Sequence, residues 1–172
     1  MNKIVKVILV ITLVSGMLIT GCSGKSNQEG PEVGKQAPDF QLSTLDGQTV
    51  ALSELGGTPV LVNFWQIRCP PCREEMPYLQ QIYDEWQERG LVVLGINIGE
   101  SPSHVADFMQ SQELSLPVLL DTNQEVARGY YIQYIPSTFF IDKNGIIQDM
   151  KVGAFQSKAE IESSLNKLAI TK

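Results

Sequence analysis

A Cys-Pro-Pro-Cys sequence at residues 69–72 lies where a strand pattern gives way to a helical pattern. Residues 60–65 form a short, largely apolar run of β-favouring residues, which predicts a buried strand. From Pro70 onward, apolar residues recur every three or four positions as far as Trp86, and Gly90 follows where a helix C-cap belongs. The first cysteine is therefore predicted at the N-terminus of a helix, where prolines are tolerated because first-turn amides have no helical partner.

This position favours redox chemistry at the cysteine pair. The helix dipole and the unpaired amides stabilise a thiolate at Cys69, and Cys72 in the first turn is placed to resolve a mixed disulfide. A zinc site would need three or four ligands, and the single histidine, His104, lies far along the chain. A purely structural disulfide that closes so short a loop would contribute only about 2 kcal/mol. We therefore predict a redox-active pair that needs no separate cofactor and no metal.

The first 22 residues have the pattern of an export signal. Lys3 and Lys6 precede an apolar run over residues 7–19, and small residues follow just before Cys22. This order predicts a signal peptide over residues 1–21. The alternative is a retained transmembrane helix, although a span needs about 20 apolar residues. The residues up to Cys22 also resemble the lipobox of bacterial lipoproteins, which implies cleavage before Cys22 and lipidation of that cysteine.

The segment that follows is polar and offers almost nothing to bury. We predict a flexible tether over residues 22–36 and a single folded domain over residues 37–172. The formal net charge of −6 argues against nucleic-acid binding, which depends on neutralising phosphates. Membrane attachment is therefore assigned to the lipid, and the domain is expected on the outer, extracytoplasmic face of the cytoplasmic membrane.

The remainder of the chain alternates strand and helix patterns and closes with a hairpin and a helix. This order predicts an α/β fold with a central mixed β-sheet flanked by helices. Residues 40–50 predict an additional N-terminal β-hairpin that turns at Asp46-Gly47. Further strands are predicted over residues 91–98, 116–120, 138–141 and 146–152, and further helices after Ser101, over residues 123–129 and after Ser157.

Two segments resemble a known superfamily. Asn63-Phe64-Trp65 with the Cys-Pro-Pro-Cys sequence, and Tyr134-Ile135-Pro136-Ser137-Thr138 with the apolar residues after it, are similar to the thioredoxin superfamily. More narrowly, residues 37–168 resemble the ResA/TlpA group of membrane-tethered thiol–disulfide oxidoreductases. The resemblance implies a thioredoxin-like fold and a protein-disulfide reductase. It also implies two partners: the CxxCH site of apocytochrome c as substrate, and a membrane thiol transporter of the CcdA/DsbD type as electron donor.

The resemblance also implies roles for individual residues. Cys69 matches the exposed nucleophile of the group, Cys72 the buried resolving thiol, and Pro136 the cis-proline that lies against the disulfide. Glu75 matches a carboxylate kept beside the active site, and its spacing from Cys72 places it on the same helix face. Glu100 matches a further group position. The alternative for both glutamates is a solvated surface position.

The sequence departs from its relatives next to the first cysteine. Most relatives have tryptophan there, whereas this chain has Arg68, a cation that should lower the pKa of Cys69 and make the couple more oxidising. The alternative is that Arg68 points to solvent and has little effect. Asn63 replaces the buried aspartate that assists the resolving thiol in thioredoxin, so Glu75 is a candidate for that proton transfer. Arg68, Glu100 and Trp65 are predicted to modulate the pair.

Other functions remain open at this stage. Within the same fold, the chain is a candidate thiol oxidase or a general reductant for exported proteins. A dithiol peroxidase is disfavoured, because Gln66 occupies the place where peroxiredoxins need threonine. A copper-binding assembly protein that uses Cys69 and Cys72 without turnover is the alternative from a different class.

Overall fold

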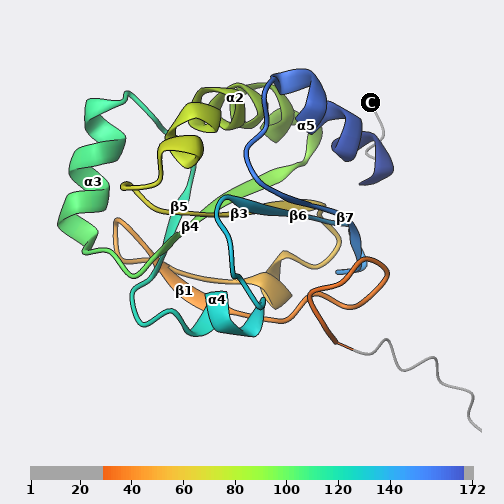
Figure 1. The fold of residues 1–172 in the computed structure, drawn as a ribbon. Helices are drawn as coiled ribbons and strands as arrows, with labels where there is room; N and C mark the ends of the chain where they lie inside the picture. Colours follow the sequence, from red (N-terminus) through yellow and green to blue (C-terminus); the bar gives the residue numbers. More distant parts are fainter. Residues whose placement is uncertain (1–28, 169–172) are drawn as a thin grey trace, which may run out of the picture.

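Seven strands form one mixed sheet in the computed structural model, which describes residues 29–168. Across the sheet the order is β2-β1-β5-β4-β3-β6-β7 (Figure 1). The three central strands β3, β4 and β5 are parallel, and every other pairing is antiparallel. The strands are β1 (Gln41–Thr44), β2 (Thr49–Ala51), β3 (Val60–Trp65), β4 (Val92–Ile98), β5 (Val118–Asp121), β6 (Ser137–Ile141) and β7 (Ile147–Val152).

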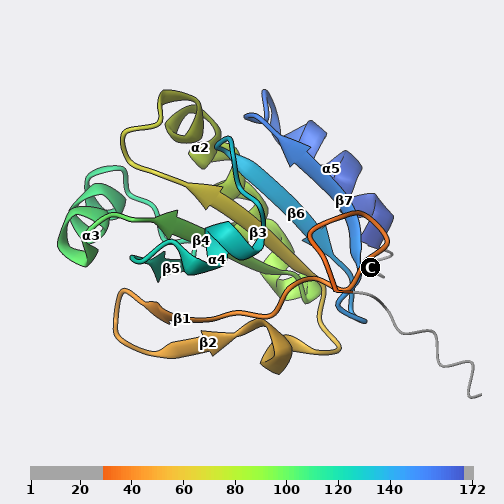
Figure 2. The ribbon, with the colours of Figure 1, turned by 60° about the horizontal axis from the view of Figure 1, so that its bottom comes forward.

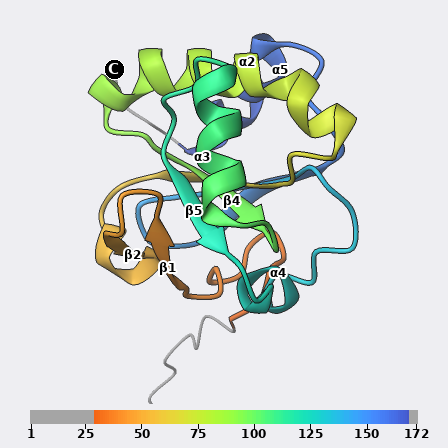
Figure 3. The same cartoon turned by 90° about the vertical axis from the view of Figure 1, so that its left-hand side faces the viewer.

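Helices cover both faces of this sheet. α2 and α5 lie side by side on one face, and α4 lies on the other (Figure 1). α3 runs along β5 at one side of the molecule (Figure 3). The α-helices are α2 (Pro70–Trp86), α3 (Pro102–Ser111), α4 (Glu125–Gly129) and α5 (Lys158–Leu165), and the short 3-10 helices are η1 (Leu52–Leu55), η2 (Gln87–Arg89) and η3 (Asn166–Leu168).

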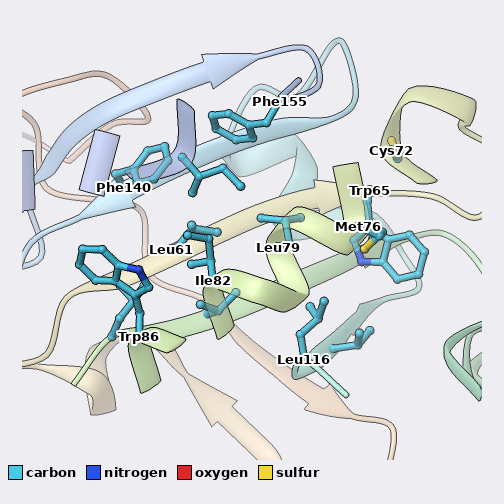
Figure 4. Close-up of a cluster of buried hydrophobic side chains, with 14 of the residues drawn as sticks. Leu61, Trp65, Cys72, Met76, Leu79, Ile82, Trp86, Leu116, Phe140 and Phe155 are labelled. Carbon is cyan, nitrogen blue, oxygen red and sulfur yellow. The ribbon is translucent and has the colours of Figure 1, made fainter. Parts of the chain in front are cut away.

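The central strand β3 divides its side chains between two cores. All six of its residues are buried, and alternate residues point to opposite faces. Leu61 and Trp65 join Met76 and Leu79 of α2 in the core beneath α2, α3 and α5 (Figure 4). Val60, Val62 and Phe64 point the other way and pack into the second core, beneath α4. Asn63 belongs to the α2 face, and this register brings its amide to the helix that carries the cysteines.

The observed architecture confirms the predicted α/β fold with a central mixed sheet flanked by helices (Figure 1). The N-terminal hairpin forms as β1 and β2, with Gly47 in the left-handed region at φ 82° in its turn. The hairpin joins the edge of the sheet through antiparallel pairing of β1 with β5 (Figure 2).

The prediction of a tether over residues 22–36 is wrong for its second half. Residues 29–36 are folded against the start of β7 through backbone hydrogen bonds, including Gly34 N–H to Ile147 O (2.8 Å) and Ile147 N–H to Lys35 O (3.0 Å). Gln36 also bridges to Ile146. The composition misled because backbone hydrogen bonds, which residue types do not reveal, hold most of this segment in place; Pro31 is its one buried residue.

Two elements begin two residues later than predicted. The strand expected from residue 116 begins at Val118, because the Leu116 N–H donates to the side chain of Gln80 (3.0 Å) instead of a neighbouring strand. The helix expected from residue 123 begins at Glu125. The buried Asp121 carboxylate there accepts the N–H groups of Val126 and Ala127 and fixes the start of α4.

The predicted signal peptide and Cys22 lie outside the described residues. None of the helices between residues 29 and 168 combines the length and the apolar character that crossing a bilayer requires. The export signal and the lipid anchor therefore stay predictions from the sequence.

Candidate active site

Cys69 and Cys72 form a disulfide at the N-terminus of α2. Cys69 is the N-cap residue, and its Sγ accepts a hydrogen bond from the Cys72 N–H at 3.2 Å. Because this amide belongs to the first helical turn, it would equally stabilise a thiolate on Cys69. Cys69 is 8% exposed and Cys72 is fully buried, so an incoming sulfur can reach only Cys69.

The loop between β3 and Cys69 is held to the end of β4 by two side chains. Gln66 Nε2 donates to the Ile98 carbonyl at 2.9 Å. Glu100 Oε2 accepts the backbone N–H of Ile67 and the Nδ2 of Asn97, each at 2.8 Å. Glu100 is therefore no free surface glutamate: it fixes the backbone two residues before Cys69. Gln66 is likewise committed to a structural hydrogen bond.

Arg68 points outward from this loop. Its side chain is 75% exposed, and its Nε lies 3.9 Å from Glu100 Oε1. A carboxylate this close offsets part of the positive charge, and solvent screens the remainder. Arg68 therefore stabilises a thiolate on Cys69 less than an isolated cation would.

Trp65, the third predicted modulator, lies behind this loop with its indole fully buried. Its ring packs against Phe108 of α3 at a centroid distance of 5.5 Å. Gly95 on β4 lies against the same ring, since a Cβ at this position would come within 3.1 Å of Trp65 Nε1. Trp65 therefore supports the strand end that carries the cysteine loop rather than contacting solvent.

A second loop, before β6, closes the site on its other side. The Ile135–Pro136 peptide bond is cis, and the Ile135 carbonyl oxygen lies 3.8 Å from Cys69 Sγ. Ser137 Oγ donates to the Tyr134 carbonyl at 2.8 Å, and the Gly153 N–H donates to the Pro136 carbonyl at 2.8 Å. The loop is thus fixed from both β6 and the end of β7. Pro136 occupies the position expected from the resemblance.

Glu75 is buried beneath the disulfide helix. Its side chain has no exposed surface, and its carboxylate accepts hydrogen bonds from Asn63 Nδ2 and from the Phe155 N–H, each at 2.8 Å. Burial raises the pKa of Glu75 to about 7, although the Phe155 amide, the Asn63 amide and the charge of Lys151 oppose the shift. A carboxyl that titrates near neutral pH, one helical turn from Cys72, is suited to exchange a proton with it.

The Glu75 network includes partners that the sequence did not indicate. Asn63 Nδ2 also donates to Thr138 Oγ1 at 2.9 Å, and Asn63 Oδ1 is buried with no hydrogen-bond partner among the described residues. The Phe155 amide comes from the turn after β7, 80 residues from Glu75. A backbone donor leaves no trace in residue type, so only the three-dimensional arrangement locates it.

No group of three histidine, cysteine or acidic side chains between residues 29 and 168 is arranged to hold a metal ion. His104, the single histidine, is exposed in the first turn of α3, where its N–H donates to the N-cap Ser101 Oγ at 3.4 Å. The residues described above bring together an exchangeable disulfide, a helix N-terminus and a titratable buried carboxyl, and these are the groups that dithiol exchange requires.

Comparison with known proteins places this arrangement among its relatives. Residues 33–150 match the model of the AhpC/TSA family. The chain is 32% identical over 170 residues to the thiol-disulfide oxidoreductase ResA of Bacillus cereus, covering 97% of each chain. A thiol:disulfide interchange protein of the thioredoxin family from Chlorobium tepidum superposes with a TM-score of 0.68 at 34% identity, over 76% of this chain and 93% of that one. StoA from Bacillus subtilis superposes with a TM-score of 0.66 at 25% identity, over 74% and 96% of the two chains.

Proposed function

The chain belongs to the AhpC/TSA family and, within it, to the ResA-type thiol–disulfide oxidoreductases, and we propose that it reduces disulfides in exported proteins. The substrate that we propose is the oxidised CxxCH site of apocytochrome c. The observation that carries the proposal is the set of groups around the Cys69–Cys72 disulfide: the helix N-terminus, the cis-proline loop and the buried Glu75.

The proposed cycle transfers two electrons from the protein dithiol to the substrate. The Cys69 thiolate attacks one sulfur of the substrate disulfide, forms a mixed disulfide and releases the other substrate sulfur as a thiolate. The Cys72 thiolate then attacks Cys69 Sγ, which re-forms the Cys69–Cys72 disulfide and releases the second substrate thiolate. Both substrate thiolates take up protons, and a dithiol donor in the membrane, of the CcdA/DsbD type, restores the protein dithiol.

Glu75 is proposed to accept the Cys72 proton before the second step. Cys72 is fully buried, so its proton has no direct route to bulk solvent. A carboxylate with a pKa of about 7 is half ionised at neutral pH, when it can take up that proton and return it. Glu75→Gln should therefore slow resolution of the mixed disulfide more than it changes the midpoint potential. An unchanged exchange rate would remove Glu75 from the mechanism.

The midpoint potential of the Cys69–Cys72 couple tests the direction of transfer. A value near or below about −270 mV, the potential of thioredoxin, supports a reductase. A value toward about −120 mV, the potential of DsbA, would assign the protein as an oxidase and exclude the cytochrome substrate. Arg68 is the residue that favours the second outcome, but its exposure and its proximity to Glu100 weaken its effect.

The substrate is tested with a synthetic CxxCH peptide in its disulfide form. Reduced protein should convert the peptide to its dithiol with one equivalent of Cys69–Cys72 disulfide formed. Cys69→Ser should abolish the conversion, whereas Cys72→Ser should trap the mixed disulfide. A scrambled peptide that reacts equally fast would restrict the proposal to a general reductant.

The location is proposed on the predicted lipoprotein signal alone. Processing before Cys22 would give a mature chain with a lipid on its first residue and the domain outside the cytoplasmic membrane. Labelling of cells with a radioactive fatty acid tests this, with Cys22→Ala as the control. Label that persists in the variant would contradict lipidation at Cys22.

A further inference from the structure

A single turn holds both the buried carboxyl and the cis-proline loop. Residues 153–157 connect β7 to α5, and we call them the β7–α5 turn. The Phe155 N–H donates to Glu75 Oε2 at 2.8 Å, and the Gly153 N–H donates to the Pro136 carbonyl at 2.8 Å. Because these two amides lie only two residues apart, a shift of the turn would disturb both hydrogen bonds together.

Packing fixes the inner side of the turn. The Phe155 side chain is buried, and its ring meets that of Phe140 on β6 at a centroid distance of 6.1 Å (Figure 4). Lys151 Nζ on β7 lies 5.0 Å from the centroid of the same ring, where a cation is attracted to the aromatic face. The ring of Phe155 is therefore held from two strands.

One carboxylate holds the outer side of the turn. Glu160, in the first turn of α5, accepts the Gln156 N–H at 3.0 Å and Lys151 Nζ at 3.2 Å, both on Oε2. Gln156 directly follows Phe155, so Glu160 restrains the residue next to the amide that reaches Glu75. The same carboxylate holds Lys151 beside the Phe155 ring.

This contact is not the one that helix capping requires. Ser157 is the N-cap of α5, and its Oγ accepts the Glu160 N–H at 3.4 Å. In a capping box the carboxylate would accept the N–H of the N-cap residue itself. Here Glu160 binds the N–H of Gln156, one residue earlier, and so reaches into the turn.

Several groups act on the proton affinity of Glu75. Burial raises its pKa, and the Phe155 N–H, the Asn63 amide and the charge of Lys151 lower it. The other nearby group on β6, Thr138, is uncharged and bonds to Asn63. In the reduced protein, the two active-site thiols also titrate, on the same helix as Glu75.

Charged side chains on the elements packed around α2 are joined in ion pairs: Lys151–Glu160, Lys158–Glu85, Lys158–Glu162 and Lys167–Asp149. Because Glu160 neutralises Lys151, loss of the Glu160 charge would leave Lys151 unopposed and would lower the pKa of Glu75. Loss of the Phe155 hydrogen bond would raise it. The charge of Glu160 and its grip on the turn therefore act on Glu75 with opposite signs.

We propose that Glu160 is a positioning residue for proton transfer at Cys72: through the β7–α5 turn it holds the Phe155 N–H on the Glu75 carboxylate, and so sets the pH at which Glu75 can take up that proton. This inference rests on the proposed function, since it assumes that Glu75 accepts the Cys72 proton. Glu160 acts through the backbone of the turn and takes no part in the sulfur chemistry.

Two substitutions at residue 160 separate position from charge. Glu160→Ala removes the acceptor of the Gln156 N–H and loosens the turn, so the pKa of Glu75 should rise by about 0.5 unit, part of the roughly 1–2 units that a hydrogen bond to a charged group is worth. Glu160→Gln loses the charge but keeps an oxygen that can accept the Gln156 N–H. In this variant the pKa of Glu75 should not rise.

Carbon-13 NMR of glutamate side-chain carboxyls in the oxidised protein measures the titration, and Glu75→Gln identifies the resonance. The matched control is Glu162→Ala, on the same helix: the Glu162 side chain is 36% exposed against 42% for Glu160, and it also pairs with a lysine. This control should leave the Glu75 midpoint unchanged. Hydrogen exchange at the Gly153 and Phe155 amides should be about two- to tenfold faster in Glu160→Ala alone.

A Glu75 midpoint that stays the same or falls in Glu160→Ala would overturn the proposal, as would an equal rise in Glu162→Ala. If the alanine variant does not fold, Glu160→Asp provides the test. Aspartate keeps the charge at the start of α5 but is one methylene shorter, so it should also raise the midpoint.

The pH dependence of exchange with the CxxCH peptide disulfide tests the proposed function separately. In the reduced wild-type protein the rate should follow the titration of Glu75, and the inflection should move upward in Glu160→Ala. If the Glu75 midpoint moves as expected but wild type and Glu75→Gln share one rate profile, the proposed proton transfer fails, while the role of Glu160 in placing the Phe155 amide is supported. If the peptide is not reduced at all, the proposed function fails, and the carboxyl titration still decides the role of Glu160.

Discussion

The pH dependence of stability should reveal the buried carboxyl directly. The pKa of Glu75 is raised from 4.5 to about 7 on folding, so the folded protein holds a proton that the unfolded chain has already released between these values. Raising the pH from 4.5 through 7 therefore destabilises the folded state. In Glu75→Gln this titration is absent, and the corresponding loss of stability should disappear.

The size of the effect follows from the shift. One pKa unit corresponds to about 1.4 kcal/mol, so a shift from 4.5 to about 7 corresponds to about 3 kcal/mol of unfolding free energy. No screening correction is needed, because the side chain has no exposed surface. Other carboxyl groups titrate in both proteins, so their contributions cancel in the difference between wild type and variant.

Urea unfolding of the oxidised proteins between pH 4 and 8, without reductant, measures this difference. Between pH 4.5 and 8, the wild-type unfolding free energy should fall by about 3 kcal/mol relative to that of Glu75→Gln. The matched control is Glu74→Gln, which removes an exposed carboxylate from the same helix and leaves the buried network intact. Parallel curves for wild type and Glu75→Gln would refute the assignment of Glu75 as a neutral-pH titrating group.

Three further predictions concern the scaffold around the site. Gly95→Ala places a Cβ 3.1 Å from Trp65 Nε1 and should destabilise the protein by about 1–3 kcal/mol in urea unfolding, with a change in tryptophan fluorescence of the folded state. Glu100→Ala removes the acceptor of the Ile67 N–H, and should cost about 1–3 kcal/mol and speed hydrogen exchange at that amide. Asp121→Ala removes the carboxylate that caps α4, and should cost about 1–2 kcal/mol in thermal unfolding; an unchanged melting temperature would contradict the capping role.

The sequence predicted best where local chemistry marks an element. The predicted strand over residues 60–65 has the same bounds in the structure, because an apolar run there ends at the cysteine loop. Prolines after Cys69 marked the start of α2 equally well. By contrast, Leu116 is buried like a strand residue, but its backbone N–H bonds to a side chain, which periodicity does not show.

The residues of the candidate site also differ in how far the sequence could predict them. The cysteine pair and Glu75 share one helix, so their spacing was sufficient to bring them together. Asn63 was singled out by resemblance, but its bond to Glu75 depends on how β3 lies beneath α2. The Phe155 amide belongs to a distant segment, and no local pattern marks it as a partner of Glu75.

The fold of residues 29–36 has a consequence for how the protein meets its partners. This segment is hydrogen-bonded to Ile147 and bridges to Ile146, beside the strand ends where Ile141 pairs with Val60 at the start of β3. The disulfide follows the opposite end of β3, about 16 Å away along the strand.

If Cys22 carries the lipid as proposed, the anchored segment enters the domain near the start of β3, at the end of the sheet opposite the disulfide. The six residues between Cys22 and Glu29 span at most about 25 Å. With so short a linker, a domain that stands on its N-terminal side places the disulfide away from the membrane, where soluble polypeptides can reach it. If the electron donor is also the proposed membrane transporter, the disulfide has to approach the bilayer to be reduced, so the domain has to rotate on this segment. Under these two proposals, the two half-reactions require different orientations of the domain: the disulfide faces away from the membrane when substrate is reduced and toward it when the donor reduces the protein.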